Sequence, residues 1–461
     1  MAQGERIGGT AVVIGASMAG LLAARVLAER CGEVIIFERD TLPGGADHRR
    51  GVPQSRHAHA LLGGGREALE TLLPGLTDAL VARGAVRGGR RIFSGGGYHH
   101  PVRRGPEGLF VSRPLLEDEV RTRVRALPNV RIIDGCDACG LTTSADGTRV
   151  NGLRLARRGA GAEKETVAAD LVVDAGGRGS RTPAWLDALG YPHPEEELVD
   201  VKMGYATREY RREPAHLDGN LMLTVAPTRT NRRACGMLAE EGDRWIITLA
   251  GYFGDYPPTD EAGFLEFARS LPTPEIAEVV RSAAPLTDLL PFRFPANQWR
   301  HYERLARFPE GLLVIGDAVA SFTPIYGQGM TVAAREALAL RDCLARGTDR
   351  LAPRFFKRAS EAIAIAWSIT VGNDRKLSGS PDSQTGVKRL LNWYLGKLQV
   401  AARHDETVAY AFLRAANLLA APPSLLRPDI ALRVLWGNLR VPGRDRSGEG
   451  RRKPQPQLWR S

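Results

Sequence analysis

The stretch AVVIGASMAGLLAARVLAERCGEVIIFER, residues 11–39, decides the fold of this chain. It opens with an apolar run at 11–14 that has the length of a buried strand, and a second such run follows at 34–37. An Ala- and Leu-rich segment with helical spacing separates the two runs. Strand, helix and strand in this order predict the βαβ unit of an α/β fold with a parallel sheet.

The turn between the first strand and the helix reads Gly15-Ala-Ser-Met-Ala-Gly20, a pattern typical of dinucleotide sites. Gly15 permits a sharp turn, Ser17 is small enough for a pyrophosphate to approach the backbone, and Gly20 lets the helix pack closely on the sheet. Amides at the helix start point at the phosphates. Glu38 is placed to accept hydrogen bonds from an adenosine ribose and would repel a 2′-phosphate, so the resident cofactor should be FAD or NAD.

Composition and charge narrow the class of protein. With 461 residues, 43% hydrophobic and 25% charged, the chain should bury a large core in two domains. The net charge is +11, but the arginines are scattered, so we expect no nucleic-acid partner. No apolar run reaches transmembrane length and the segment MAQGERIGG has no signal-peptide character, so we expect a cytoplasmic protein. Five cysteines with a single CxxC at 136–139 predict free thiols and no metal site.

The pattern of apolar residues changes along the chain and predicts its domain organisation. Alternation typical of antiparallel strands dominates the middle of the chain, where large aromatic side chains gather, and some of these should line an apolar pocket. The substrate-binding candidates are Tyr205, Trp245, Phe253, Phe292, Phe294 and, from a later loop, Tyr326. The expected units are a Rossmann-type nucleotide-binding domain over 8–195 with a β excursion at about 80–111, an inserted antiparallel β-sheet substrate domain over 196–300, the second part of the nucleotide-binding domain over 301–350, a helical C-terminal region over 351–441 and a basic flexible tail over 442–461.

Two further motifs follow buried strands. The first is DAGGRGSR at 174–181, after the apolar run that ends at Asp174. The second begins with Gly316-Asp317, and Asp317 ends a strand at the sheet edge where open α/β sheets bind ligands. Gly327 and Gly329 precede an Ala/Leu-rich helix, whose first amides would point at the same ligand.

The three motifs together resemble those of the FAD-dependent aromatic hydroxylases and epoxidases with the p-hydroxybenzoate hydroxylase fold, the group A flavoprotein monooxygenases. The resemblance spans roughly residues 10–350. More narrowly, RRGVPQSRHAHALL at 49–62 and TPIYGQGM at 323–330 are similar to bacterial epoxidases that act on polyene precursors of polyether natural products. Thr331, where Asn is common, Gly177 in place of a usual acid and the absence of His after Asp317 depart from the hydroxylase pattern more than from the epoxidase pattern.

The resemblance implies FAD as the cofactor and a role for each motif. The first turn would hold the pyrophosphate, Glu38 the adenosine ribose, Arg113 the phosphate or ribose region, and Cys136-Asp137 would lie by the adenine. Asp317 would bind the ribityl-pyrophosphate, and the 324–330 loop would lie along the isoalloxazine, where a helix N-terminus favours negative charge. The expected FAD contacts are Gly15, Ser17, Met18, Ala19, Gly20, Glu38, Arg39, Arg50, Gln54, His57, Arg113, Cys136, Asp137, Asp174, Gly316, Asp317, Pro324, Gly327, Gly329 and Met330.

The resemblance also implies the chemistry: O₂ reacts with reduced FAD, and the C4a-hydroperoxyflavin transfers one oxygen atom. We expect epoxidation of a carbon–carbon double bond in a lipophilic polyketide or terpenoid, with no protein nucleophile or paired carboxylates needed. The chain has no second complete βαβ fingerprint, so NAD(P)H would bind only transiently, with Arg49, Arg50 or Arg56 receiving its phosphates. Reduced flavin from a partner reductase is the alternative source of electrons.

Other functions stay open at this stage. An aromatic hydroxylase of the same fold would need a base that the sequence does not identify. A flavin-dependent halogenase is disfavoured because Trp367-Ser-Ile-Thr-Val lacks the WxWxIP signature of that class. A geranylgeranyl-reductase-type alkene reductase is a further alternative. A non-enzymatic alternative is a flavin-binding membrane-surface protein whose helical segment 407–440 docks on lipid, although packing of these helices on the FAD domain is the simpler expectation.

Overall fold

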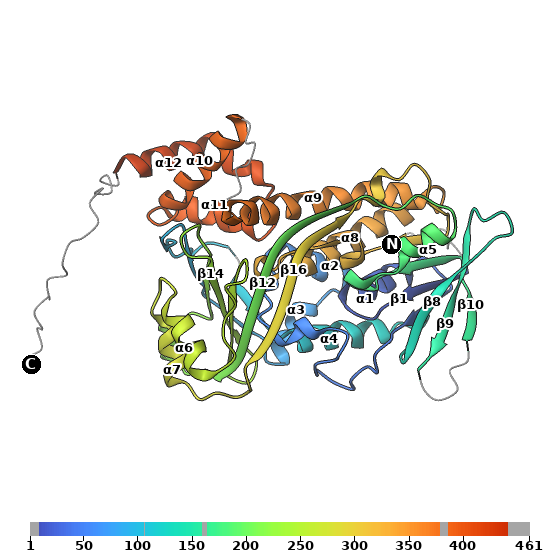
Figure 1. Cartoon of the computed structure of the whole chain (residues 1–461), viewed down its shortest axis with the longest axis horizontal. Helices are drawn as coiled ribbons and strands as arrows, with labels where there is room; N and C mark the ends of the chain where they lie inside the picture. The colour runs from blue at the N-terminus through green and yellow to red at the C-terminus, as the bar shows by residue number, and fades with distance from the viewer. Residues whose placement is uncertain (1–8, 106, 159–163, 379–385, 441–461) are drawn as a thin grey trace, which may run out of the picture.

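The computed structural model describes residues 9–105, 107–158, 164–378 and 386–440. A parallel-sheet domain lies at one end, a large antiparallel sheet at the other, and a helical lobe sits beside the antiparallel sheet (Figure 1). The predicted α/β class is therefore confirmed. The predicted tail over 442–461 and residue 441 lie outside the described residues.

The parallel sheet brings the three sequence motifs to one edge. Its strands run in the order β17-β11-β1-β2-β7. In register, Ile14 at the end of β1 pairs with Asp174 at the end of β11, and Asp174 pairs with Val314 at the end of β17. The turns that follow these strands are therefore neighbours at the carboxyl edge, where ligands of open α/β sheets bind. The strands are β1 (Thr10–Ile14), β2 (Glu33–Phe37), β7 (Val130–Ile133), β11 (Leu171–Asp174) and β17 (Leu312–Val314).

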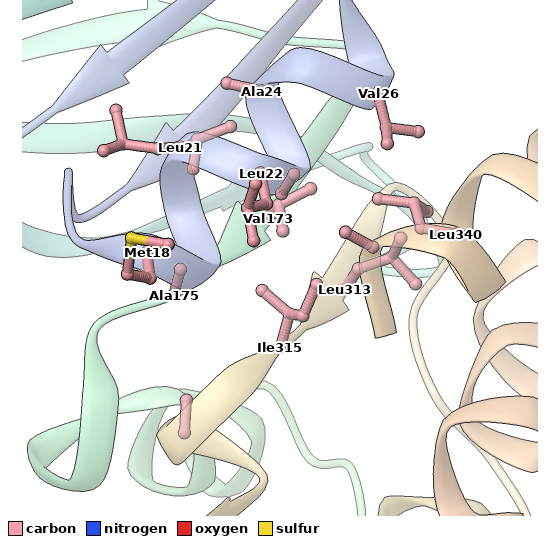
Figure 2. Packing of buried hydrophobic residues seen from close by; sticks show 14 of the residues in the cluster. Met18, Leu21, Leu22, Ala24, Val26, Val173, Ala175, Leu313, Ile315 and Leu340 are labelled. Carbon is pink, nitrogen blue, oxygen red and sulfur yellow. The ribbon is translucent and has the colours of Figure 1, made fainter. Parts of the chain in front are cut away.

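Two helices cover this sheet and start at the same edge. They are α1 (Met18–Leu27) and α8 (Gly329–Leu344). Eight of the ten residues of α1 are buried, because the helix packs both on the sheet and on α8. Figure 2 shows Leu22 of α1 against Val173 of β11, with Leu313 of β17 facing Leu340 of α8. This packing fixes the directions of both helix N-termini.

The antiparallel sheet is wider than the predicted 196–300 segment. Its order is β18-β16-β12-β15-β14-β13-β4-β5, so strands from residues 91–98 and 320–321 join it. The parallel pairing of Leu223 with Arg91 joins segments far apart in sequence, and no local pattern signals it. The strands are β4 (Arg91–Ser94), β5 (Gly97–Tyr98), β12 (Glu196–Arg211), β13 (Met222–Val225), β14 (Arg233–Glu240), β15 (Arg244–Gly251), β16 (Leu290–Arg300) and β18 (Ala320–Ser321).

Smaller elements complete the two sheet regions. Helices α6 (Glu261–Arg269) and α7 (Glu275–Ser282) cover the outer face of the antiparallel sheet (Figure 1). A three-stranded sheet of β8 (Cys136–Thr143), β9 (Val150–Arg157) and β10 (Lys164–Ala168) flanks the parallel sheet. The remaining elements are α2 (Gly63–Leu72), α3 (Leu76–Ala82), β3 (Val86–Gly88), β6 (Gly108–Phe110), α4 (Arg113–Arg125) and α5 (Thr182–Ala188).

The C-terminal region is helical, as predicted, and ends in a separate lobe. Helix α9 (Leu351–Ser378) runs along the body of the molecule and leads to the lobe (Figure 1). The lobe comprises α10 (Gly386–Ala401), α11 (Glu406–Ala416) and α12 (Pro428–Arg440) and has its own apolar core. The lobe also meets α2: a Cβ added to Gly64 would lie 2.6 Å from the Leu418 carbonyl oxygen. Within the described residues, no helix combines the length and apolarity needed to cross a bilayer.

Candidate flavin and substrate site

Glycines in the first two turns allow the backbones of these turns to touch. Gly15 has φ +96°, and a Cβ there would lie 2.8 Å from the Ala175 carbonyl oxygen. A Cβ on Gly20 would collide with the Gly15 carbonyl oxygen, so α1 packs on its own turn. Gly316, with φ +70°, lies against α1, and a Cβ there would be 2.5 Å from Cβ of Ala19. A larger residue at Gly15 would push the first and second motifs apart, and one at Gly316 would push the first and third motifs apart.

Asp317 is exposed at the carboxyl edge of the parallel sheet. Its side chain is exposed although the flanking Gly316 and Ala318 are buried. The surrounding protein raises the pKa of the carboxyl, and the nearby Arg113 and Arg178 cations act in the opposite direction. A Cβ on Gly329 would lie 3.8 Å from Asp317 Oδ1, so the N-terminus of α8 lies beside this carboxylate. The first amides of α1 and α8 have no intrahelical acceptors and are suited to an anionic group.

A buried ion cluster lies above the first turn. The Ala16 amide donates to Glu38 Oε2 over 2.8 Å. The Arg49 guanidinium lies 3.1 Å from carboxylate oxygens of Glu38 and Asp40 and 3.0 Å from Glu117. The opposite side of Glu117 accepts from Arg113, whose Nη2 is 2.8 Å away.

Two neighbouring cations keep Glu117 ionised in this cluster. Burial alone would raise the pKa of Glu117, but the Arg113 and Arg49 cations lower it below the usual range. Arg113 also donates to Ser17 Oγ over 2.9 Å, which ties α4 to the first turn. The Arg49 side chain is only 6% exposed and contacts three carboxylates, so it is not available for the NAD(P)H phosphates that the sequence assigned to it. Arg50 and Arg56 are exposed, as is Arg39.

The Asp174 side chain forms hydrogen bonds within its own loop. One carboxylate oxygen accepts from the Gly176 amide over 2.7 Å. The other accepts from the Ser180 and Thr182 hydroxyls, each over 2.5 Å. With the side chain 1% exposed, Asp174 organises its own loop, and the expectation that it touches FAD directly is corrected.

The segment Cys136-Asp137, which is predicted to lie by the adenine of FAD, is next to Glu38. The Cys136 amide donates to the Glu38 carbonyl oxygen over 2.9 Å. The Asp137 carboxylate forms an exposed ion pair with Arg158 over 2.6 Å. The Cys136 thiol is buried and all five cysteines are free. Among the described residues, no group of three or more His, Cys, Asp or Glu side chains is placed to hold a metal ion.

A cavity of about 840 Å³ lies between the antiparallel sheet and the C-terminal lobe. The 54–62 and 324–328 segments border it on the side of the nucleotide domain, and Gln54, His57, Pro324 and Gly327 are among its lining residues. The inner face of the sheet contributes mostly small or apolar side chains: Met222, Thr224, Ala234, Gly236, Thr248 and Ala250. Helices α9, α10 and α11 close the opposite side, with Trp367, Leu391, Leu395 and Phe412 among the lining residues.

The aromatic residues predicted to bind substrate divide between several places. Tyr205 and Tyr326 line the cavity, and Phe292 stacks on Tyr205 at 6.1 Å between ring centroids. Phe294 and Phe253 do not line this cavity. Each ring instead packs against an arginine, Arg178 or Arg232, whose guanidinium carbon is 5.1 Å from the ring centroid.

Trp245 does not line the cavity, so its prediction as a substrate-binding residue is wrong. It is fully buried in the apolar cluster under α6 and α7, and its indole N–H contacts His216. Thr248 and Ala250 of the same strand face the cavity, so Trp245 points to the other face.

A buried polar cluster adjoins the cavity below Tyr326. The Asp374 carboxylate of α9 accepts from the Tyr326 hydroxyl over 3.0 Å and from the Tyr252 hydroxyl over 3.1 Å. Its second oxygen accepts from Asn297 and Thr323, each over 2.7 Å. Burial raises the pKa of Asp374, while these four donors lower it. The chain from Tyr326 to Asp374 therefore links the cavity wall to a buried carboxylate.

His57 lies on the substrate side of the site. Its Nδ1 is 2.7 Å from the Thr207 hydroxyl, which is 2.7 Å from the Thr248 hydroxyl. The imidazole ring is 5.1 Å from the Phe292 ring. Burial lowers the pKa of His57 to about 4, so the ring is neutral at physiological pH. Its placement makes it a cavity residue as well as a candidate for flavin contact.

Comparisons with known proteins give the family. The sequence pattern of the family described as FAD dependent oxidoreductase matches residues 11–183. Protein Rv3254 of Mycobacterium tuberculosis is 34% identical over 457 residues, which cover 94% of this chain and 94% of that protein. Kynurenine 3-monooxygenase of Salinispora arenicola is 30% identical over 366 residues, which cover 74% of this chain and 73% of that enzyme. The chain belongs to the FAD-dependent monooxygenases.

A solved structure has the same fold as this monooxygenase. A flavoprotein/dehydrogenase from Cytophaga hutchinsonii superimposes with a TM-score of 0.64, covering 94% of this chain and 98% of that one. The two sequences are 15% identical, so the likeness concerns the fold alone.

The residues at the sheet edge fit FAD. The glycine contacts at Gly15, Gly20 and Gly316 keep a cradle open, and Asp317 presents an exposed carboxylate to it. Glu38 and the N-termini of α1 and α8 provide an acceptor and donors that suit ribose and phosphate groups. When bound, FAD supplies the redox and oxygen-transfer chemistry, and the protein binds, orients and shields the reactants.

The C-terminal helices line part of the cavity, which no sequence pattern had indicated. The sequence contains one indication of Asp374. This residue shares a buried face of α9 with Ile363, Ala366 and Thr370, and an acid on such a face needs a hydrogen-bond partner. Its partners Tyr252, Asn297, Thr323 and Tyr326 come from other elements, and no local pattern joins them.

Proposed function

We propose that this monooxygenase transfers one oxygen atom of O₂ to a carbon–carbon double bond of a large lipophilic natural product, a polyketide or terpenoid, and forms an epoxide. The second oxygen atom leaves as water, and NAD(P)H or a reduced flavin from a partner reductase supplies the two electrons. The observation that carries the proposal is the cavity of about 840 Å³, lined mainly by apolar residues, beside the 324–328 segment. Such a volume suits a drug-sized apolar ligand.

The chain's own residues support this reaction by shape and exclusion of water. The small residues Ala234, Gly236 and Ala250 leave room on the sheet face, and Leu391 and Leu395 close the cavity from the lobe. Burial of apolar substrate surface stabilises the complex by about 25 cal/mol per Å². An alkene has no proton to lose on epoxidation, so the neutral His57 does not need to act as a base.

A second candidate, hydroxylation of an aromatic ring, is favoured by the polar cluster at Asp374. A phenol hydroxyl at the Tyr326 side chain could pass its proton through the Tyr326 hydroxyl to the carboxylate, 3.0 Å away. A related enzyme, kynurenine 3-monooxygenase, carries a name of this reaction class. The cluster would then supply the base that the sequence did not reveal.

The two candidates are separated by turnover with ¹⁸O₂. The FAD-loaded enzyme is incubated with NADPH and either a lipophilic polyene or a small phenol, and the products are weighed by mass spectrometry. We expect one ¹⁸O atom in the polyene product. Coupled hydroxylation of phenols without turnover of alkenes would move the enzyme to the second candidate.

The Tyr326→Phe variant refines the comparison because it removes only the hydroxyl that contacts Asp374. Epoxidation should change by no more than a few-fold. Hydroxylation that depends on general base catalysis through this hydroxyl should fall by about 10²-fold or more. The flavin content of the variant, measured from its absorption spectrum, controls for loss of cofactor.

A further inference from the structure

The outer face of the C-terminal lobe is unusually apolar. Four residues of α12 lie at helical spacing on one side: Leu432, Leu435, Trp436 and Leu439 are 68%, 47%, 58% and 80% exposed. We call these four residues the outer face of α12. The opposite side of the helix already packs in the lobe core through Ile430 and Val434. Helix α12 is therefore apolar on two sides, and only the inner side is needed to fold the lobe.

The exposure is concentrated in this lobe. Of the twelve large apolar side chains that are exposed among the described residues, nine lie between 387 and 439. The other three, Val81, Leu198 and Leu286, are scattered singly over the body. Single exposed apolar residues are normal on protein surfaces, whereas a cluster rimmed by polar residues marks a binding surface. The lobe members outside α12 are Val387, Leu390, Leu391, Trp393 and Leu426.

The lobe and the sequence that follows it carry an excess of basic residues. Residues 386–440 contain eight Lys or Arg and three Asp or Glu. The sequence that follows, 441–461, contains six Lys or Arg and two Asp or Glu. A short amphipathic helix with Leu and Trp on one side and a basic surrounding is the pattern of a helix that lies in a membrane interface.

Other occupants fit less well. The segments 379–385 and 441–461 contribute only Val441, Leu458 and Trp459 as large apolar residues, too few to cover the outer face. A helix of 13 residues is about 20 Å long and 10 Å wide, so the outer face of α12 alone offers a second copy only a small contact surface. A stable dimer needs roughly 800 Å² per partner, and two basic lobes would repel each other.

We propose that the outer face of α12 docks on the surface of an anionic lipid bilayer. The three leucines enter the boundary between headgroups and acyl chains, and the lobe's excess of cations draws the helix to anionic headgroups. Docking would place the lobe, whose Leu391, Leu395 and Phe412 line the substrate cavity, at the lipid surface. The docking itself does not depend on the proposed function, because it concerns a face outside the cavity.

Sedimentation with vesicles tests this proposal. The full-length, FAD-loaded protein is mixed with vesicles of phosphatidylcholine alone or of phosphatidylcholine and phosphatidylglycerol in equal parts. We expect binding to the anionic vesicles that weakens as salt is added. The Leu435→Asp/Leu439→Asp variant should bind at least about tenfold more weakly, with unchanged flavin content and thermal midpoint.

A matched control is Leu198→Asp, which replaces a 56% exposed leucine on β12 and should bind like the wild type. Equal loss in both variants, or no loss in the α12 variant, would overturn the proposal. Light scattering without lipid adds one decisive outcome. A wild-type dimer that the α12 variant converts to a monomer, with no vesicle binding, would assign the outer face of α12 to a second copy of the chain.

Discussion

Gly316→Ala tests the contact between the first and third motifs. Two costs arise from the structure. The backbone at Gly316 has φ +70°, where an L-residue costs about 1–2 kcal/mol. The added Cβ would also lie 2.5 Å from Cβ of Ala19, well inside ordinary contact, and overpacking of this kind costs about 1–3 kcal/mol. Because the strain falls where α1 meets the proposed FAD cradle, FAD affinity should drop about tenfold or more.

A matched control isolates the close approach from the backbone strain. Gly190 has φ +72°, but nothing lies within 4 Å of an added Cβ. Gly190→Ala should therefore be destabilised only by the backbone strain, and its FAD affinity should be unchanged. In the Gly316→Ala protein, Ala19→Gly removes the one atom of the described residues, chain neighbours aside, that the new Cβ meets within 4 Å. This double variant should recover the overpacking cost, less about 0.5–1 kcal/mol for a glycine in a helix.

The assay combines thermal unfolding with FAD titration by fluorescence. It compares the wild type, the single variants Gly316→Ala, Gly190→Ala and Ala19→Gly, and the double variant Gly316→Ala/Ala19→Gly. The expected order of stability places Gly316→Ala lowest and the double variant between it and the wild type. The reasoning would be refuted by a Gly316→Ala protein that behaves like Gly190→Ala. A double variant no better than Gly316→Ala would refute the role of Ala19.

Two further predictions concern Asp317 and His57. Asp317→Ala removes an exposed acceptor from the proposed FAD site. FAD affinity should fall about 10- to 100-fold, which corresponds to about 1–3 kcal/mol. An unchanged FAD affinity in a fluorescence titration would show that Asp317 does not bind FAD. Burial lowers the pKa of His57 from its usual 6.5 to about 4, so between these values the unfolded chain binds a proton that the folded chain does not, and stability falls as pH falls. The free energy of unfolding is measured with urea at about pH 7 and pH 4. The loss of stability between these two values should be roughly 3 kcal/mol smaller in His57→Gln than in the wild type. An unchanged pH dependence would contradict the burial of a neutral His57.

The local sequence was sufficient for the nucleotide domain because its signals are local. A strand, a turn that requires small residues and a helix follow one another within residues 11–39, and the steric demands of that turn are met by Gly15 and Gly20 themselves. The parallel register then brings the later motifs to the same edge, as βαβ geometry requires. A dinucleotide cofactor and the α/β fold could therefore be predicted from the local sequence, and the resemblance of the three motifs narrowed the cofactor to FAD.

The substrate side was decided by the tertiary structure. Both faces of β15 are apolar, so alternation could not show that Thr248 faces the cavity while Trp245 packs under α6 and α7. In the sequence Arg49 is a candidate phosphate ligand, but the folded chain surrounds it with carboxylates from the loop after β2 and from α4. Asp374 joins the site only because α9 returns over the antiparallel sheet. Ion pairs, buried hydrogen bonds and the choice of sheet face depend on distances between segments remote in sequence, and those distances exist only in the folded chain.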